Sequence, residues 1–224
     1  MKFENTEVWG FEHSLRGMRN PKNSWNRSDS FYDGNLNNHY IIGENDMKLA
    51  QTLIKAGNEH RKFMRQIFVS VDITAPLYWW KEFDTYKVGT VANSTSTMHK
   101  LATTPITLDC FEIDDYDRNL SLADNPKDDD GLDNISTFEE DIIYVLENIR
   151  KKYLETKDKR YWKELVRWLP ESWLQKRTIT MNYENVRNMY FQRRNHKLTE
   201  WSESFIKWVE SLPYAKELIM YEGQ

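Results

Sequence analysis

The chain has 224 residues, of which 39% are hydrophobic and 29% charged, so it can bury a compact core and has the composition of a globular protein. No stretch provides the roughly 20 apolar residues of a membrane span, and Met1 to Gly10 lacks the apolar region of a signal peptide. A net charge of -4 without an evident basic face argues against nucleic-acid partners, and a single cysteine, Cys110, excludes an internal disulfide framework. We therefore expect a cytoplasmic protein with neither nucleic-acid nor membrane partners.

The first half of the chain alternates between irregular and periodic segments. Residues 1–43 are polar and aromatic, which predicts an irregular N-terminal segment of loops with short elements. Residues 45–55 carry apolar side chains at helical spacing. In residues 67–74, β-branched aliphatic residues occupy every second position and alternate with Phe68, Ser70, Asp72 and Thr74, which predicts a strand with one buried face. Pro76 suits the first turn of a following helix, expected to run from Leu77 to about Tyr86.

A loop rich in hydroxyl and amide groups follows that helix, over residues 87–99. Such loops can cradle a phosphate through their donors, although most are ordinary turns. The segment is not a Walker loop, because no Gly-Lys-Ser/Thr sequence closes it.

Residues 112–135 are acidic and rich in turn residues, which predicts an exposed loop. The segment lacks calcium-loop spacing, since Pro126 and Thr137 stand at the first and last ligand positions. Helices are expected from Ser136 onward. The first carries one apolar face, and the predicted members of that face are Phe138, Ile142, Val145, Leu146 and Ile149. Further expected elements are helices over 161–168, 182–197 and 200–212, and a short strand over 177–181.

These elements together predict the α+β class. We expect a single domain over residues 1–224 with a central antiparallel or mixed sheet flanked by helices, and with its core at about residues 45–215. The five histidines show no metal-ligand spacing, so no metal site is predicted. Cys110 lies in a sequence with no neighbouring base, which favours a buried structural role over a nucleophilic one.

The segment from Asn182 to Arg194 is the most polar of the expected helices. Asn182 is a good helix cap, and Arg193, eleven residues later, lies about three turns along nearly the same face. Arg193, Arg194 and Arg187 make the helix rich in donors that suit a phosphate or a uracil carbonyl. On this pattern alone, a solvated surface helix is the simpler interpretation.

The wider spacing around this helix resembles that of the flavin-dependent thymidylate synthases (the thymidylate synthase complementing protein family). The matching residues are Leu169-Pro170, Thr180, Asn182, Asn188 and Arg193. The resemblance implies that Asn182 and Asn188 lie at FAD, and that Arg193 binds and polarises the uracil ring of dUMP as the catalytic residue. An arginine before the Leu-Pro pair contacts dUMP in that family, and Arg167 is the nearest candidate here.

A second segment, Gln66 to Lys100, is similar to the family's strand, Ala-Pro, helix and signature loop. The family signature reads Arg-His-Arg, then Ser, Asn-Glu, Ser and Arg. With one inserted residue, the corresponding residues here are Thr85-Tyr86-Lys87, Thr90, Asn93-Ser94, Ser96 and Met98-His99. The resemblance implies FAD contacts from Tyr86, Lys87, Thr90 and Asn93. It implies dUMP contacts from Lys87, Ser94 and Ser96.

The activity that the resemblance implies is reductive methylation of dUMP to dTMP. FAD would be the cofactor, with NADPH and methylenetetrahydrofolate as co-substrates, in a homo-oligomer expected to be a homotetramer. Two alternatives remain open at this point. One is a related flavin enzyme that hydroxymethylates dUMP, and the other is a non-catalytic nucleotide-binding protein that has lost the flavin site.

Overall fold

The computed structural model describes residues 1–34, 39–117, 120 and 135–223. The single domain predicted from the sequence divides into two compact units. The sheet unit comprises Lys2–Ile73, Phe83–Asn93 and Thr178–Gln224. The helical unit comprises Met1, Thr74–Glu82 and Ser94–Arg177. The predicted acidic loop at 112–135 lies largely outside the described residues.

The main sheet has four strands in the order β1-β4-β6-β5. Their bounds are β1 Lys2–Trp9, β4 Phe68–Pro76, β5 Val91–Ser94 and β6 Leu174–Asn182. Strands β4 and β6 run antiparallel, because Thr180 contacts Ser70 while Thr178 contacts Asp72. A separate hairpin pairs β2 (Phe31–Asp33) with β3 (His39–Ile41). The predicted α+β class with an antiparallel sheet is confirmed.

Strand β4 forms the core of the sheet unit, as its alternating sequence predicts. Ile67, Val69, Val71 and Ile73 are all fully buried, while the residues between them are partly exposed. A strand with one face against helices has this pattern. The predicted strand at 177–181 is likewise confirmed but longer, since β6 runs from Leu174 to Asn182 and lies between β4 and β5 in the sheet.

The N-terminal segment differs from the irregular structure predicted for residues 1–43. It contains β1 and the helix α1 (Phe11–Met18). Strand β1 occupies an edge of the sheet, and most of its side chains are exposed. It therefore lacks the apolar alternation by which a half-buried strand is recognised in a sequence.

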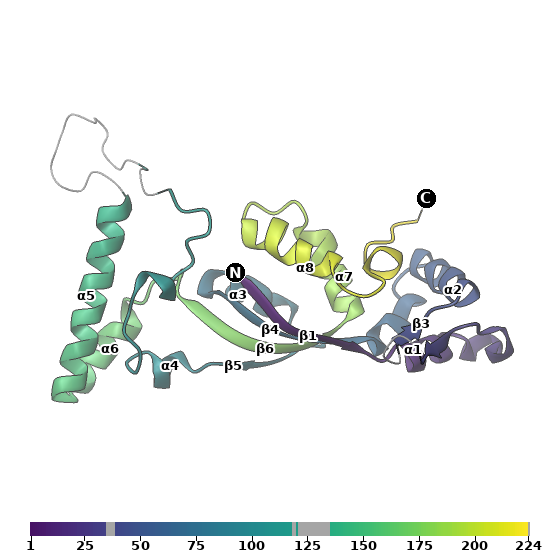
Figure 1. Ribbon diagram of the computed structural model, residues 1–224, viewed down its shortest axis with the longest axis horizontal. Coiled ribbons are helices and arrows are strands. Elements are labelled where there is room, and N and C mark those ends of the chain that lie inside the picture. Colours follow the sequence, from purple (N-terminus) through teal and green to yellow (C-terminus); the bar gives the residue numbers. More distant parts are fainter. Residues whose placement is uncertain (35–38, 118–119, 121–134, 224) are drawn as a thin grey trace. The chain divides into compact units, whose positions relative to one another are not determined.

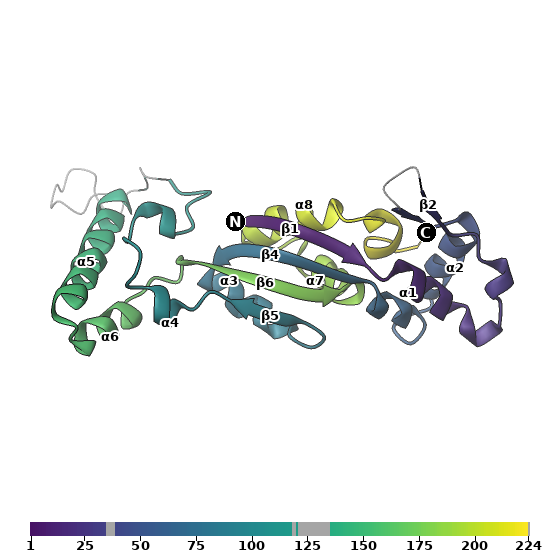
Figure 2. The same ribbon diagram turned by 60° about the horizontal axis from the view of Figure 1, so that its bottom comes forward.

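Helices of the sheet unit lie on the sheet and around its end. These elements are α2 (Glu44–Lys55), α7 (Tyr183–Arg193), a π-helical segment Glu200–Phe205, α8 (Ile206–Glu210) and a π-helical turn Ala215–Ile219. Both ribbon views show α7 and α8 over the same face of the sheet (Figures 1 and 2). Trp208 of α8 stacks on Phe3 of β1 with ring centroids 4.9 Å apart, which ties this layer to the edge strand.

The helical unit contains α4 (Thr97–Lys100), α5 (Ile135–Thr156), α6 (Lys159–Arg167) and most of α3 (Leu77–Phe83). Helices α5 and α6 pack side by side (Figure 1). Leu146 and Leu165 join Leu101 and Phe111 in the core of this unit. The apolar face predicted for the first helix is only partly buried, because Phe138 and Val145 are about half exposed.

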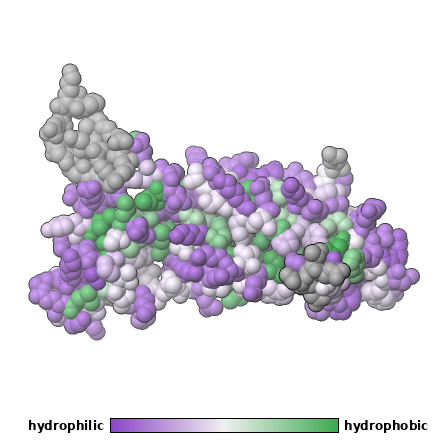
Figure 3. Space-filling view, in the orientation of Figure 1, coloured by the Kyte–Doolittle hydropathy of each residue, from purple (hydrophilic) through white to green (hydrophobic). Residues whose placement is uncertain are grey.

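Hydrophobic side chains also gather at the surface of the helical unit beside α5 (Figure 3). Cys110 is half-buried and packs against the core of this unit, and its thiol lies 3.7 Å from the Pro105 carbonyl. Within the described ranges, no helix is both long and apolar enough to cross a membrane.

Candidate functional site

The first turn of α7 fixes the position of the polar residues at one end of the sheet unit. Asn182 caps the helix, as predicted: its side-chain oxygen accepts from the backbone N–H of Asn185 at 3.0 Å. The Asn185 side chain in turn reaches back to the Asn182 backbone N–H, which completes a capping box. The same Asn185 amide donates to the carbonyl of Val88 at 2.8 Å. Asn185, itself held by Asn182, therefore joins the helix to the loop that precedes β5.

Gly89 lets that loop approach the helix. Its φ is +78°, a conformation that favours glycine, and a Cβ at this position would lie 3.2 Å from the Asn185 side-chain oxygen. The loop backbone and the asparagine pair thus lie in direct contact.

These residues belong to a cleft of about 530 Å³ in the sheet unit. Most of its wall is amide, hydroxyl or charged side chains, and the lining residues are Asn58, Arg65, Thr85, Tyr86, Val88, Gly89, Asn182, Glu184, Asn185, Asn188 and Gln192. The predicted residues Tyr86, Asn182 and Asn188 are thus brought together. The Asn188 amide has no hydrogen-bond partner among the described residues, so it is available to a ligand in the cleft.

Two arginines set the charge of this cleft. The Arg61 Nε donates to both carboxylate oxygens of Glu184, at 3.0 and 3.2 Å, and Glu184 is only 6% exposed. This pairing neutralises the one acidic lining residue. Arg65 is exposed at the rim and pairs with no acidic residue in the described part of the chain. The cleft therefore offers positive charge and amides to an anionic, carbonyl-bearing ligand.

Arg193 lies next to the cleft, held by two aromatic rings. Its Nε donates to the Tyr86 hydroxyl at 2.8 Å, and the same hydroxyl donates to the Gln192 side-chain oxygen at 2.9 Å. The guanidinium carbon lies 5.4 Å from the Tyr86 ring centroid and 4.9 Å from that of Trp201. Trp201 is fully buried, so this cation–π contact fixes the guanidinium against a rigid wall.

The other two arginines of α7 serve the fold. Arg187 is buried and donates to the carbonyls of Leu218 and Ile219, which anchors the C-terminal turn. Burial and the nearby charge of Arg61 lower the pKa of Arg187 from its ordinary value. Arg194 pairs with Glu222 at 2.6 Å. Of the three arginines that make the sequence donor-rich, only Arg193 therefore lies beside the cleft.

The signature-loop residues predicted from the resemblance occupy several places. Lys87 and Thr90 form the turn around Gly89, with the Thr90 N–H donating to the Lys87 carbonyl at 3.1 Å. Asn93 is exposed on β5, a strand where the sequence predicts a loop. None of these three residues lines the cleft.

Ser94, Ser96 and Arg167 belong to the helical unit. The Ser96 hydroxyl caps α4 and lies 2.7 Å from His99 Nδ1. Ser94 is exposed at the end of β5. Arg167 ends α6 and forms an ion pair with Glu164. Their proposed contacts with dUMP stay predictions.

The structure also adds residues that sequence reasoning missed, chiefly Asn58, Arg61, Arg65 and Asn185. Arg61 and Arg65 lie on a 3-10 helix, Arg61–Gln66, just before the buried strand β4. Side chains three positions apart, not four, share a face of such a helix, so the spacing of these two arginines gave no usable signal. Asn185 did carry a signal, because an N3 side chain that reaches back to the cap is typical of capping boxes.

Comparisons with known proteins bear on the fold. No family model matches the sequence, and no curated protein matches it. The chain is similar to a crystal structure of the flavin-dependent thymidylate synthase ThyX from Helicobacter pylori complexed with FAD and dUMP, with a TM-score of 0.65 and 16% identity over 98% of both chains. A second structure of Helicobacter pylori ThyX with FAD and dUMP gives a TM-score of 0.65 and 16% identity over 100% of both chains. The resemblance predicted from the segment Leu169–Arg193 is thereby confirmed for the architecture, and the chain has the fold of flavin-dependent thymidylate synthases.

Proposed function

We propose that this protein binds dUMP and FAD and catalyses the reductive methylation of dUMP to dTMP. Methylenetetrahydrofolate would donate the carbon and NADPH the reducing equivalents, in a cytoplasmic homotetramer. The observation that carries the proposal is Arg193, held by Tyr86 and Trp201 beside an amide-rich cleft in a chain with the fold of enzymes that bind FAD and dUMP.

The residues of the cleft fit a flavin. A flavin presents ring carbonyls and N–H groups, and the amides of Asn188, Asn58 and Gln192 offer both donors and acceptors. Arg65 adds a positive charge for a phosphate. By resemblance, Tyr86, Lys87, Thr90, Asn93, Asn182 and Asn188 would hold the cofactor. FAD, when bound, would supply the hydride chemistry of the reaction.

Arg193 would serve the nucleotide electrostatically. Negative charge develops on the uracil ring as its C5 becomes nucleophilic, and a fixed guanidinium stabilises that charge without reorganising. By resemblance, Lys87, Ser94, Ser96 and Arg167 would bind the rest of dUMP. No protein nucleophile is required, so the half-buried Cys110 has no part in this scheme.

The Arg193→Ala variant tests the proposal. We expect dUMP affinity to fall by about 10- to 100-fold, because a charge-assisted hydrogen bond is lost, while the protein stays folded. Arg193→Lys should lose a similar amount, since an ammonium cannot reproduce the planar fork or its contacts with two rings. Calorimetric titration with dUMP measures both, and Arg194→Lys, on the same helix, is the matched control. Unchanged dUMP affinity in Arg193→Ala would remove the basis of the proposal.

The cofactor is tested separately, by the visible absorbance of the purified protein with and without added FAD. Yellow protein that converts dUMP, NADPH and methylenetetrahydrofolate to dTMP supports the proposed reaction. Hydroxymethyl product would instead identify the related hydroxymethylase. Colourless protein that ignores FAD but still binds dUMP would identify a non-catalytic nucleotide-binding protein.

A further inference from the structure

A second cavity, of about 260 Å³, lies in the helical unit and is independent of the cleft. Its wall comes from α5, from the segment around Phe111 and from the chain after α6, and the residues used below are Phe111, Glu112, Tyr116, Phe138, Glu139 and Ile142. We call it the Glu139 cavity. An isolated bridge between Phe111 and Trp173, whose rings meet edge to face at 5.6 Å, fixes one side. The wall is predominantly apolar and aromatic.

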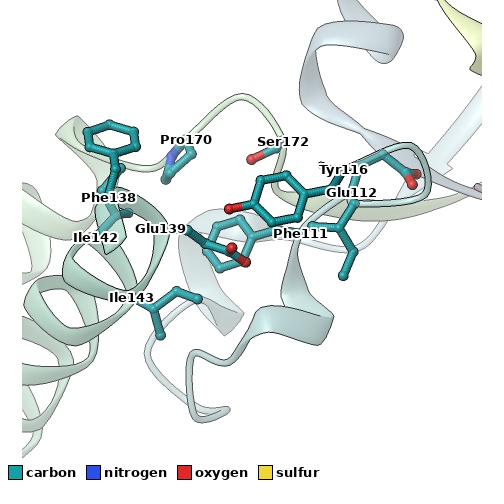
Figure 4. A pocket seen from close by; sticks show the side chains of 10 residues that line it. Phe111, Glu112, Tyr116, Phe138, Glu139, Ile142, Ile143, Pro170 and Ser172 are labelled. Carbon is teal, nitrogen blue, oxygen red and sulfur yellow. The ribbon is translucent and has the colours of Figure 1, made fainter. Parts of the chain in front are cut away.

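The carboxylate of Glu139 lies in this predominantly apolar wall. The Glu139 carboxylate extends from α5 toward Phe111 and Tyr116 (Figure 4). Both of its oxygens are shielded from solvent, and neither accepts a hydrogen bond from any residue that the structure describes. Burial of an unpaired carboxylate opposes folding, so such a group indicates a role outside the fold.

The second carboxylate of the wall differs in this respect. A Glu112 oxygen lies 2.9 Å from the amino group of Met1, and Asp114 lies 2.7 Å from the same group. Glu112 is therefore compensated by an ammonium, while Glu139 lacks the equivalent within the described residues.

We propose that the Glu139 cavity binds a small organic monocation, namely a primary ammonium attached to an apolar or aromatic body. On binding, the Glu139 side chain would turn so that its shielded carboxylate pairs with the ammonium, and the faces of Phe111 and Tyr116 would add cation–π attraction. The apolar body would occupy the volume beside Ile142 and Phe138. The cavity is slightly smaller than ordinary ligand pockets of about 300–1,000 Å³, which suits a compact ligand. This site does not depend on the proposed methylation of dUMP.

Benzylamine is the probe, and benzyl alcohol is its neutral counterpart of the same shape. For a ligand of this size we expect a Kd on the order of 1 mM for benzylamine, measured by ligand-observed NMR on the full chain. The alcohol should bind at least about tenfold more weakly, and Glu139→Gln should weaken benzylamine by a similar factor. Glu140→Gln, at the next position of α5, is the matched control and should leave the affinity unchanged.

A stability measurement separates a ligand site from a structural carboxylate. Without ligand, Glu139→Met should raise the Tm, because it replaces an unpaired buried charge by an apolar side chain of similar length. A lower Tm would show that the carboxylate serves the fold and would overturn the proposal. It would also be overturned by equal affinity for the amine and the alcohol, by full benzylamine affinity in Glu139→Gln, or by the absence of binding.

Discussion

Tyr86, which the resemblance predicts at the position of a histidine in the family signature, has a defined contact in the structure. Its hydroxyl accepts from Arg193 and donates to Gln192, so both of its hydrogen-bonding roles are used and its orientation is fixed. The Tyr86 ring also meets that of Trp201 edge to face at 6.2 Å. The Tyr86 side chain therefore orients the guanidinium of Arg193.

The Tyr86→Phe variant tests this orienting role. The ring remains but both hydrogen bonds are lost, so dUMP affinity should fall about five- to tenfold, corresponding to about 1 kcal/mol. Tyr86→Ala also removes the cation–π contact and should weaken binding further. Calorimetric titration with dUMP measures both, and Tyr144→Phe, at a 70% exposed tyrosine, is the control. Wild-type affinity in Tyr86→Phe would show that Arg193 keeps its orientation without the hydroxyl.

The buried carboxylate of Asp46 makes the stability of the fold depend on pH. Asp46 is fully buried and accepts from Arg19 at 2.5 Å and from the hydroxyls of Ser28 and Ser30, both at 2.6 Å. Burial alone would raise the pKa of Asp46, but these donors outweigh burial and lower it below its ordinary value. The stabilisation is therefore present at neutral pH and is lost as the pH falls through the lowered pKa.

Asp46→Asn should reduce the free energy of unfolding at neutral pH by about 3 kcal/mol or more, because buried Arg19 loses its counter-charge. The loss of stability on acidification should also be smaller in the variant than in the wild type. Urea unfolding at neutral and acidic pH measures both effects. Glu44→Gln, an exposed change in the first turn of the same helix, should cost less than about 0.5 kcal/mol. Equal acid sensitivity of Asp46→Asn and the wild type would contradict this account.

Local sequence signals located some site residues and missed others. The helix cap at Asn182 was predictable because capping is a property of neighbours along the chain, whereas the site role of Arg193 was taken from the resemblance and stays a prediction. Arg65 and Asn58 were not identified, because tertiary packing brings their segment to a cleft whose other residues lie far along the chain. The buried role of Arg187 was also unpredictable, since its acceptors are carbonyls about thirty residues away.

At the scale of elements, the loop around Gly89 and the start of α7 behave as one structure. Gly89→Ala should lower the free energy of unfolding by about 1–2 kcal/mol through its positive φ, and the new Cβ would press on Asn185. FAD affinity should fall as well, because the cleft wall moves. Gly57→Ala is the matched control, since Gly57 also has positive φ, at +104°, but no atom lies within 4 Å of an added Cβ. A fluorescence titration with FAD compares the two, and equal FAD affinities would contradict the coupling.

Among the elements, central strands and amphipathic helices were predictable while edge strands were not. Strand β4 was recognisable from its alternation because one of its faces is completely buried. Strands β1 and β5 lie at the two edges of the sheet, and β5 is exposed along its whole length. Their side chains carry little burial pattern, so only pairing with a neighbour identifies them.

For the whole molecule, the sequence predicted the α+β class but not the division of contacts into two units. That division depends on distant contacts, because Thr74–Glu82 joins Ser94–Arg177 in the helical unit although Phe83–Asn93 belongs to the sheet unit. The strands β4, β5 and β6 pass from one unit into the other, so no linker composition marks the boundary.

The homotetramer is a prediction about the whole molecule. Several large apolar residues are exposed, and they include Trp9, Trp25, Phe31, Tyr32, Val88 and Val91. Aromatic residues of this kind are enriched in protein interfaces. We expect light scattering after size-exclusion chromatography to give four times the 27.0 kDa of one chain. A monomeric mass would contradict the predicted homotetramer.

The double use of Asn182 and Asn185 also has a dynamic consequence. The two side chains close the first turn of α7 and, at the same time, form part of the cleft wall. Fraying of that turn therefore dismantles the cleft, and any ligand that fills the cleft must suppress fraying. The amide hydrogen of Asn185, which is bonded to Asn182, would then exchange with solvent more slowly when the cleft is occupied. The hydrogen-exchange rate of this amide would therefore report whether a ligand, even a colourless one, occupies the cleft.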